Sequence, residues 1–94
     1  MAFRSSGTSL SPFVLPNDLC TYKPVVELDE VVVGNVVFCQ IPQDRWRYHA
    51  HLVYSKEWWE DWNDYAFEIG NIRGHINGFC TLSNVYGKLV RAER

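Results

Sequence analysis

The sequence predicts a small, mostly antiparallel β domain, built as a curled sheet or a partly open barrel with at most one short helix. Three observations support this class. The chain has 94 residues, the length of one domain. Its apolar stretches are short and rich in β-branched and aromatic residues. They are separated by Gly, Pro and Asn, which are typical of turns. We therefore expect one domain over residues 1–94, with a flexible lead-in at 1–6 and a polar tail at 91–94.

Composition defines most of the expected strands and loops. Strands are predicted over residues 19–26, 36–41, 65–69 and 85–90, and loops over residues 42–45 and 70–78. Pro24 shortens the first strand or confines it to a sheet edge, because proline lacks an N–H to donate. Gly87 indicates a bulge in the last strand. Three Gly and two Asn within residues 70–78 predict a loop with several unusual backbone conformations.

The segment 46–54 has the clearest strand pattern. Side chains of a strand point alternately to opposite faces, so Trp46 and Tyr48 are expected on one face and His49 and His51 on the other. The two imidazoles therefore share a face of the predicted sheet.

A tryptophan cluster follows this strand. Ser55 is expected to cap a short helix over residues 56–63, which would place Trp58, Trp59 and Trp62 on one helical face. Two interpretations remain open. The three indoles either cover one end of the sheet as core, or bind a protein or peptide partner, since Trp is a frequent interface anchor.

Charge and cysteine content argue against several classes of function. The formal net charge is −2 and there is no basic run, which argues against a nucleic-acid partner. The three cysteines are odd in number and widely spaced, so neither a zinc site nor a disulfide framework is indicated. The longest mostly apolar run, residues 31–41, is too short to cross a bilayer, and residues 1–11 do not form a signal peptide. We expect a cytoplasmic protein without membrane insertion, metal or other cofactor.

Two segments carry residues with catalytic potential. A serine hydroxyl becomes a good nucleophile only when a base takes its proton, and neutral imidazole is suited to that task near physiological pH. Ser9 lies in a short loop closed by Pro12, and His51 lies on the predicted strand 46–54. A serine in such a loop is also an ordinary turn residue, so the pair is a hypothesis. His49 and His75 are interpreted as possible partner or substrate contacts rather than as metal ligands.

The order of several short motifs resembles the LexA/signal peptidase class of serine peptidases, including its small phage-encoded members. Its nucleophile box, Gly-x-Ser-Met-x-Pro, is similar to residues 7–12 (GTSLSP), with Leu in place of Met. Its Gly-Asp turns, histidine-type base strand (His-Arg-Val) and Gly-Asp-Asn box resemble, in order, residues 17–19 (NDL), 34–37 (GNVV), 51–53 (HLV) and 70–71 (GN). The resemblance extends over residues 7–90, ending on the strand at 85–90.

This resemblance implies a peptidase fold in which Ser9 is the nucleophile and His51 the general base, acting on a peptide bond in a protein substrate or in the chain itself. It implies that Asn71 or Asp18 could orient the histidine and that the Ser11 hydroxyl could assist the oxyanion. A phage-encoded member would act in the host cell cytoplasm. The alternative is a catalytically inactive binding module, a phage inhibitor or adaptor that grips its partner through the tryptophans. A third possibility is a structural subunit that assembles by edge-strand pairing. The sequence does not predict the oligomeric state.

Overall fold

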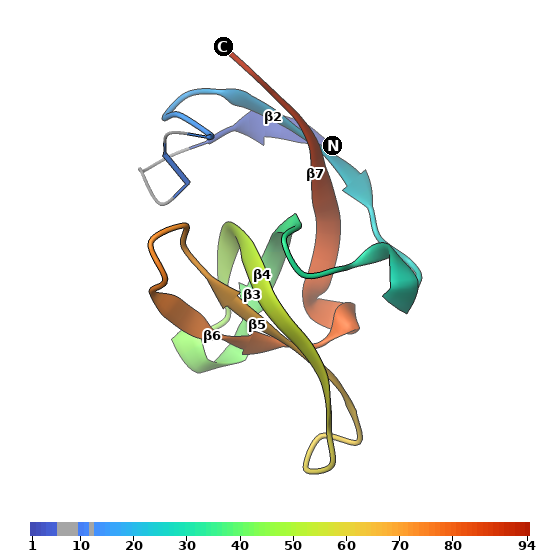
Figure 1. Ribbon diagram of the computed structural model, residues 1–94. Coiled ribbons are helices and arrows are strands. Elements are labelled where there is room, and N and C mark those ends of the chain that lie inside the picture. The colour runs from blue at the N-terminus through green and yellow to red at the C-terminus, as the bar shows by residue number, and fades with distance from the viewer. Residues whose placement is uncertain (6–9, 12) are drawn as a thin grey trace.

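The computed structural model describes residues 1–5, 10–11 and 13–94, which form one seven-stranded antiparallel sheet (Figure 1). The strands are β1 (Ala2–Arg4), β2 (Leu19–Pro24), β3 (Val36–Ile41), β4 (Arg47–Trp59), β5 (Asp64–Gly70), β6 (Ile76–Cys80) and β7 (Val85–Glu93). Their order in the sheet is β1-β2-β7-β3-β4-β5-β6. The described part of the chain also contains three one-turn 3₁₀ helices, η1 (Leu28–Glu30), η2 (Pro42–Asp44) and η3 (Leu82–Asn84), and no α-helix. The predicted mostly β, curled-sheet class is confirmed.

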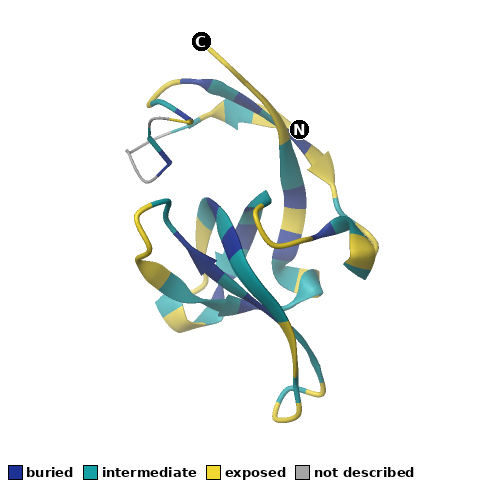
Figure 2. Cartoon of the chain, viewed as in Figure 1, coloured by how far each residue is buried: buried dark blue, intermediate teal, exposed yellow. Residues whose placement is uncertain are grey.

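The sheet curls into a half-barrel and buries apolar side chains on both of its faces. Strand β3 shows why. Val37, Cys39 and Ile41 belong to one buried cluster with residues of β4, β5 and β6, whereas Val36 and Phe38 pack against a second cluster beside β1 and β2. Because strand side chains alternate, one β-branched strand can supply both clusters. Figure 2 shows the buried positions in the middle of the curl and more exposed positions towards the β4–β5 hairpin.

The start of β4 differs slightly from the prediction. Arg45 and Trp46 both have left-handed backbone conformations, with φ of 56° and 58°, so Trp46 lies in the turn after η2 rather than on the strand face with Tyr48. From Tyr48 onwards the predicted alternation is confirmed. His49 and His51 lie opposite Cys39 and Val37 of the first cluster, while Ala50 lies opposite Phe38.

The predicted helix over residues 56–63 is wrong. Strand β4 continues to Trp59, and a tight turn over residues 60–63 leads into β5. An isolated helix this short gains little from its own hydrogen bonds, whereas a strand here pairs with β5 over its full length. Trp58 and Trp59 consequently point to opposite faces. Trp62 returns beside Trp59 because the turn brings its N–H to the Trp59 carbonyl oxygen, at 3.2 Å.

Both ends of the chain contribute paired strand residues to the sheet where a lead-in and a tail were predicted. Residues 1–6 were expected to be a lead-in, but β1 pairs with β2, and the N–H of Tyr22 donates to the carbonyl oxygen of Met1 at 2.8 Å. At the other end β7 continues to Glu93, which lies opposite Leu19. The predicted bulge in β7 is confirmed, since the register of β3 and β7 shifts immediately before Gly87.

Candidate functional site

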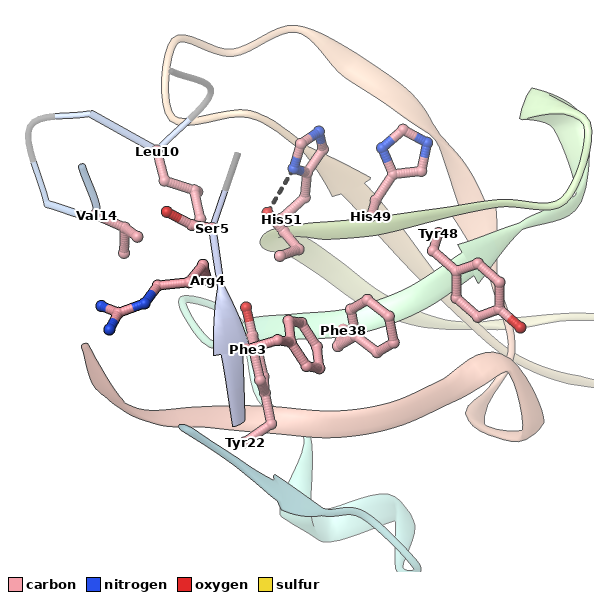
Figure 3. A pocket seen from close by; sticks show the side chains of 11 residues that line it. Phe3, Arg4, Ser5, Leu10, Val14, Tyr22, Phe38, Tyr48, His49 and His51 are labelled. Atoms are coloured by element: carbon pink, nitrogen blue, oxygen red, sulfur yellow. Dashed lines mark hydrogen bonds between the residues drawn. The ribbon is translucent and has the colours of Figure 1, made fainter. Parts of the chain in front are cut away.

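A cavity of about 430 Å³ lies between β1, β2, Leu10 and Val14 on one side and β3 and β4 on the other (Figure 3). Its lining residues are Phe3, Arg4, Ser5, Leu10, Val14, Tyr22, Phe38, Tyr48, His49, Ala50 and His51. The volume is in the range of small-ligand and side-chain pockets. Aromatic and aliphatic side chains form most of the lining, and polar groups come both from β4 and from Arg4, Ser5 and Tyr22.

Strand β4 reaches this cavity with side chains of both its faces. In the described chain, β5 pairs with β4 only from Leu52 onwards, so residues 47–51 have β3 as their sole strand partner. The free edge of this part of β4 borders the cavity. In Figure 3 the His49 and His51 rings project to one side of the strand and Tyr48 to the other, yet all three line the same space.

His51 is held in one defined tautomer. Its side chain is buried, with an exposed fraction of 9%, and Nδ1 lies 2.6 Å from the carbonyl oxygen of Ala50. A carbonyl can only accept, so Nδ1 carries the hydrogen and donates it, which leaves Nε2 with a free lone pair. Burial lowers the pKa of His51 and outweighs the opposing hydrogen bond to Ala50; the neighbouring His49 and His75 also lower this pKa. The ring is therefore a neutral base at pH 7.

A carboxylate is paired with a second histidine, His49, whose ring lies beside that of His51. Nε2–H of His49 donates to Oδ2 of Asp44 at 2.7 Å, and the His49 ring centroid lies 4.8 Å from that of His51. Asp44 was not among the residues predicted for the site. The available signal was the predicted hairpin loop over residues 42–45, because a tight turn before a strand brings its last residues beside the first side chains of that strand.

The proposed nucleophile, Ser9, lies outside the described residues, as does most of its motif. Leu10, the residue that follows it in sequence, is buried and lines the same cavity as His51. Ser11 lies half-buried in the turn that Leu10 begins, where the Leu10 carbonyl oxygen accepts the N–H groups of Phe13 and Val14 at 3.0 and 3.1 Å. The structure thus places Leu10, the sequence neighbour of Ser9, in the lining of the same cavity as His51.

The two residues suggested as orienting groups both cap turns. Oδ2 of Asp18 accepts the N–H of Leu15 at 2.8 Å, and Oδ1 of Asn71 accepts the N–H groups of Arg73 and His75 at 2.9 and 3.1 Å. The Asn71 contact with Arg73 is an Asx-turn interaction, whereas Asp18 accepts the N–H of a residue three positions before it. The group that accepts from Nδ1 of His51 is instead a backbone carbonyl, that of Ala50, which sequence analysis could not have identified.

The tryptophans do not form a single surface. Trp58 is 48% exposed and meets Tyr65 edge-on at 5.5 Å between centroids, while Trp59 is half-buried against Trp62 and Phe79 on the opposite face, at 4.8 and 4.6 Å. The hairpin that carries them extends away from the rest of the sheet (Figure 1). His75 is exposed in the loop after β5, remote from this hairpin in sequence.

Comparisons with protein-family models, with curated proteins and with solved structures find no match to this chain. Among the described residues, no helix has the length and apolar character needed to span a membrane. The same residues contain no group of three or more His, Cys, Asp or Glu side chains arranged to hold a metal ion.

Proposed function

We propose that the chain has a fold of the LexA/signal peptidase type and is a serine peptidase-like protein, in which Ser9 and His51 form a dyad that hydrolyses a peptide bond in a protein substrate or in the chain itself. One observation carries the proposal: His51, whose Nδ1–H bond to Ala50 leaves Nε2 without a hydrogen, lines a cavity that is also lined by Leu10, the neighbour of Ser9. The motif order described above supports the assignment of the nucleophile.

The chemistry follows from this tautomer. Nε2 of His51 takes the hydroxyl proton of Ser9 as the oxygen attacks the substrate carbonyl carbon. The resulting imidazolium is stabilised by its Nδ1–H bond to the Ala50 carbonyl and then protonates the leaving amine. Water deprotonated by the same nitrogen releases the acyl group from the serine. A neutral carbonyl stabilises the imidazolium less than a carboxylate would, so we expect a slow peptidase.

A fluorophosphonate probe, which labels activated serines, tests the dyad. We expect labelling of the wild-type chain, its complete loss in Ser9→Ala and a severe loss in His51→Gln, because nucleophile and base act as a unit. Ser83→Ala, which removes an exposed hydroxyl on η3 outside the cavity, is the matched control and should be labelled normally. Circular dichroism establishes that each variant is folded. Labelling that survives Ser9→Ala, or is absent from the wild type at every pH, would overturn the proposal.

One observation favours a second candidate, the inactive binding module. Trp46 and Trp58 are both large aromatic residues with about half of their surface exposed, 54% and 48%. Exposed indoles are typical anchors for protein partners. In this case the wild-type chain is not labelled, and Trp58→Ala weakens capture of a defined protein partner while His51→Gln does not.

A further inference from the structure

Aromatic rings form one continuous wall of the cavity. Phe3 stacks on Tyr22 at 5.0 Å between centroids and meets Phe38 edge-on at 4.8 Å, and Phe38 stacks on Tyr48 at 5.4 Å. These four residues come from four different strands, β1 to β4. Figure 3 shows the Phe3, Phe38 and Tyr48 rings in a row beneath the two histidines. Rings at these separations can extend the same stacked and edge-on contacts to one further aromatic side chain.

The outer end of this wall is available to a ligand. Tyr48 is 60% exposed although its ring stacks on Phe38. The lining next to this wall is apolar too, since Leu10 and Val14 are both buried and belong to one cluster with Tyr22. An apolar group that enters beside Val14 and the ring wall would thus lose its contact with water and be surrounded by apolar side chains.

The charges around the cavity do not suit a basic side chain. The described lining contains no carboxylate, and the nearest one identified, on Asp44, is already paired with His49. Arg4 contributes the one Lys or Arg side chain of the lining, and its guanidinium donates to the carbonyl oxygen of Asn17 at 3.1 Å. A lysine brought into this space would lose its hydration without gaining a counter-ion.

From these contacts we propose that the cavity is the substrate side-chain pocket of the site, and that it selects a large apolar residue, aromatic above all, and rejects small and basic residues. The inference rests on the proposed peptidase function, because it places the selected residue beside the scissile bond next to His51. The volume of about 430 Å³ leaves a methyl side chain largely without contacts, whereas a phenyl ring can contact both walls.

Peptide binding to the uncleaving Ser9→Ala chain tests the selectivity separately from catalysis. The probes are three capped heptapeptides of Gly, Ala and Ser that differ only in a central Phe, Ala or Lys, titrated by isothermal calorimetry. We expect the Phe peptide to bind about 10- to 100-fold more tightly than the Ala peptide, as burial of a large apolar side chain implies. The Lys peptide should bind no better than the Ala peptide.

Two tyrosine variants locate the binding. Tyr48→Ala, in the Ser9→Ala background, removes the outer ring of the wall and should weaken binding of the Phe peptide about 10-fold. The matched control is Tyr86→Ala, because Tyr86 belongs to the same ring cluster, 5.9 Å from Tyr48, but does not line the cavity. It should leave the affinity unchanged. Equal affinities for the Phe and Ala peptides, tight binding of the Lys peptide, or equal effects of the two tyrosine variants would each overturn the pocket.

The failures of the two proposals are distinguishable. Ser9-dependent labelling without a preference for the Phe peptide would contradict the proposed pocket but not the proposed dyad. The opposite result is also possible: the Phe peptide is preferred and Tyr48 is required, but the fluorophosphonate does not label the chain. This would contradict the proposed dyad, and with it the assignment of the pocket to a substrate.

Discussion

The Nδ1–H group of His51 donates to the carbonyl oxygen of Ala50, its own neighbour in sequence, across 2.6 Å. In a serine triad this acceptor is a carboxylate, which fixes the tautomer and also stabilises the imidazolium by its charge. The Ala50 carbonyl performs the first task fully and the second only through its dipole. The properties of the base are then determined mainly by its burial, which can be tested.

Labelling by a fluorophosphonate should depend on pH through His51. Only the neutral imidazole can take the serine proton, so labelling rises as pH increases through the pKa of His51. Because burial lowers this pKa, the midpoint should lie below about 6.5, the ordinary value for histidine. Initial labelling rates measured between acidic and neutral pH check this. A midpoint at or above the ordinary value would contradict it.

A neighbouring residue provides the control for that titration. A positive charge on His49 lowers the pKa of His51, so His49→Gln should move the midpoint of labelling to higher pH. His49 also pairs with Asp44, and glutamine can retain a hydrogen bond to that carboxylate. A midpoint that moves in the opposite direction would show that a different group controls the rate.

Acid should destabilise the fold through the same residue. A histidine whose pKa is lower in the folded than in the unfolded state binds its proton more readily after unfolding. The free energy of unfolding therefore falls as pH decreases below the unfolded pKa of about 6.5, until the folded pKa is reached. Urea midpoints at pH 7.5 and 5.5 should differ less in His51→Gln than in the wild type. His75→Gln should reduce the difference by less than His51→Gln does, because His75 only contributes to lowering the pKa of His51.

Asn71 is predicted to stabilise the loop after β5 rather than to orient His51. Its Oδ1 accepts two backbone N–H groups, those of Arg73 and His75. Asn71→Ala should cost about 1 kcal/mol of unfolding free energy, since exposed N–H groups can bond to water instead. Asn71→Asp keeps an oxygen acceptor and should cost less than half of that. Urea denaturation checks both. If the two variants were equally destabilised, this capping role would be wrong.

The strands that could be predicted are those whose composition agrees with their environment. Strand β3 occupies residues 36–41 as expected, because its β-branched residues pack on both faces of the sheet. The prediction of a helix over residues 56–63 was wrong for a different reason. Its tryptophans at i, i+1 and i+4 fit a helix, but a strand followed by a tight turn brings Trp59 and Trp62 together equally well. Local periodicity cannot separate these two cases.

The site was only partly predictable. Alternation placed His49 and His51 on one face and Tyr48 on the other, and the register of β3 and β4 agrees. The cavity itself depends on how the sheet curls, which brings β1 and its Phe3 beside Phe38 of β3, and no local pattern encodes that approach. The Ala50 carbonyl is equally invisible in sequence, since every residue has one.

The hairpin tryptophans provide the last prediction, which compares two adjacent residues of the same type. Trp59 is half-buried between Trp62 and Phe79, so Trp59→Ala removes two ring contacts and should cost about 2 kcal/mol of unfolding free energy. Trp58 is half-exposed and contacts the ring of Tyr65. Trp58→Ala should therefore cost under about 1 kcal/mol. A helix with both indoles on its inner face would give similar losses for the two variants. Urea denaturation followed by far-UV circular dichroism distinguishes the cases, and comparable losses would mean that the β4–β5 hairpin is wrongly described.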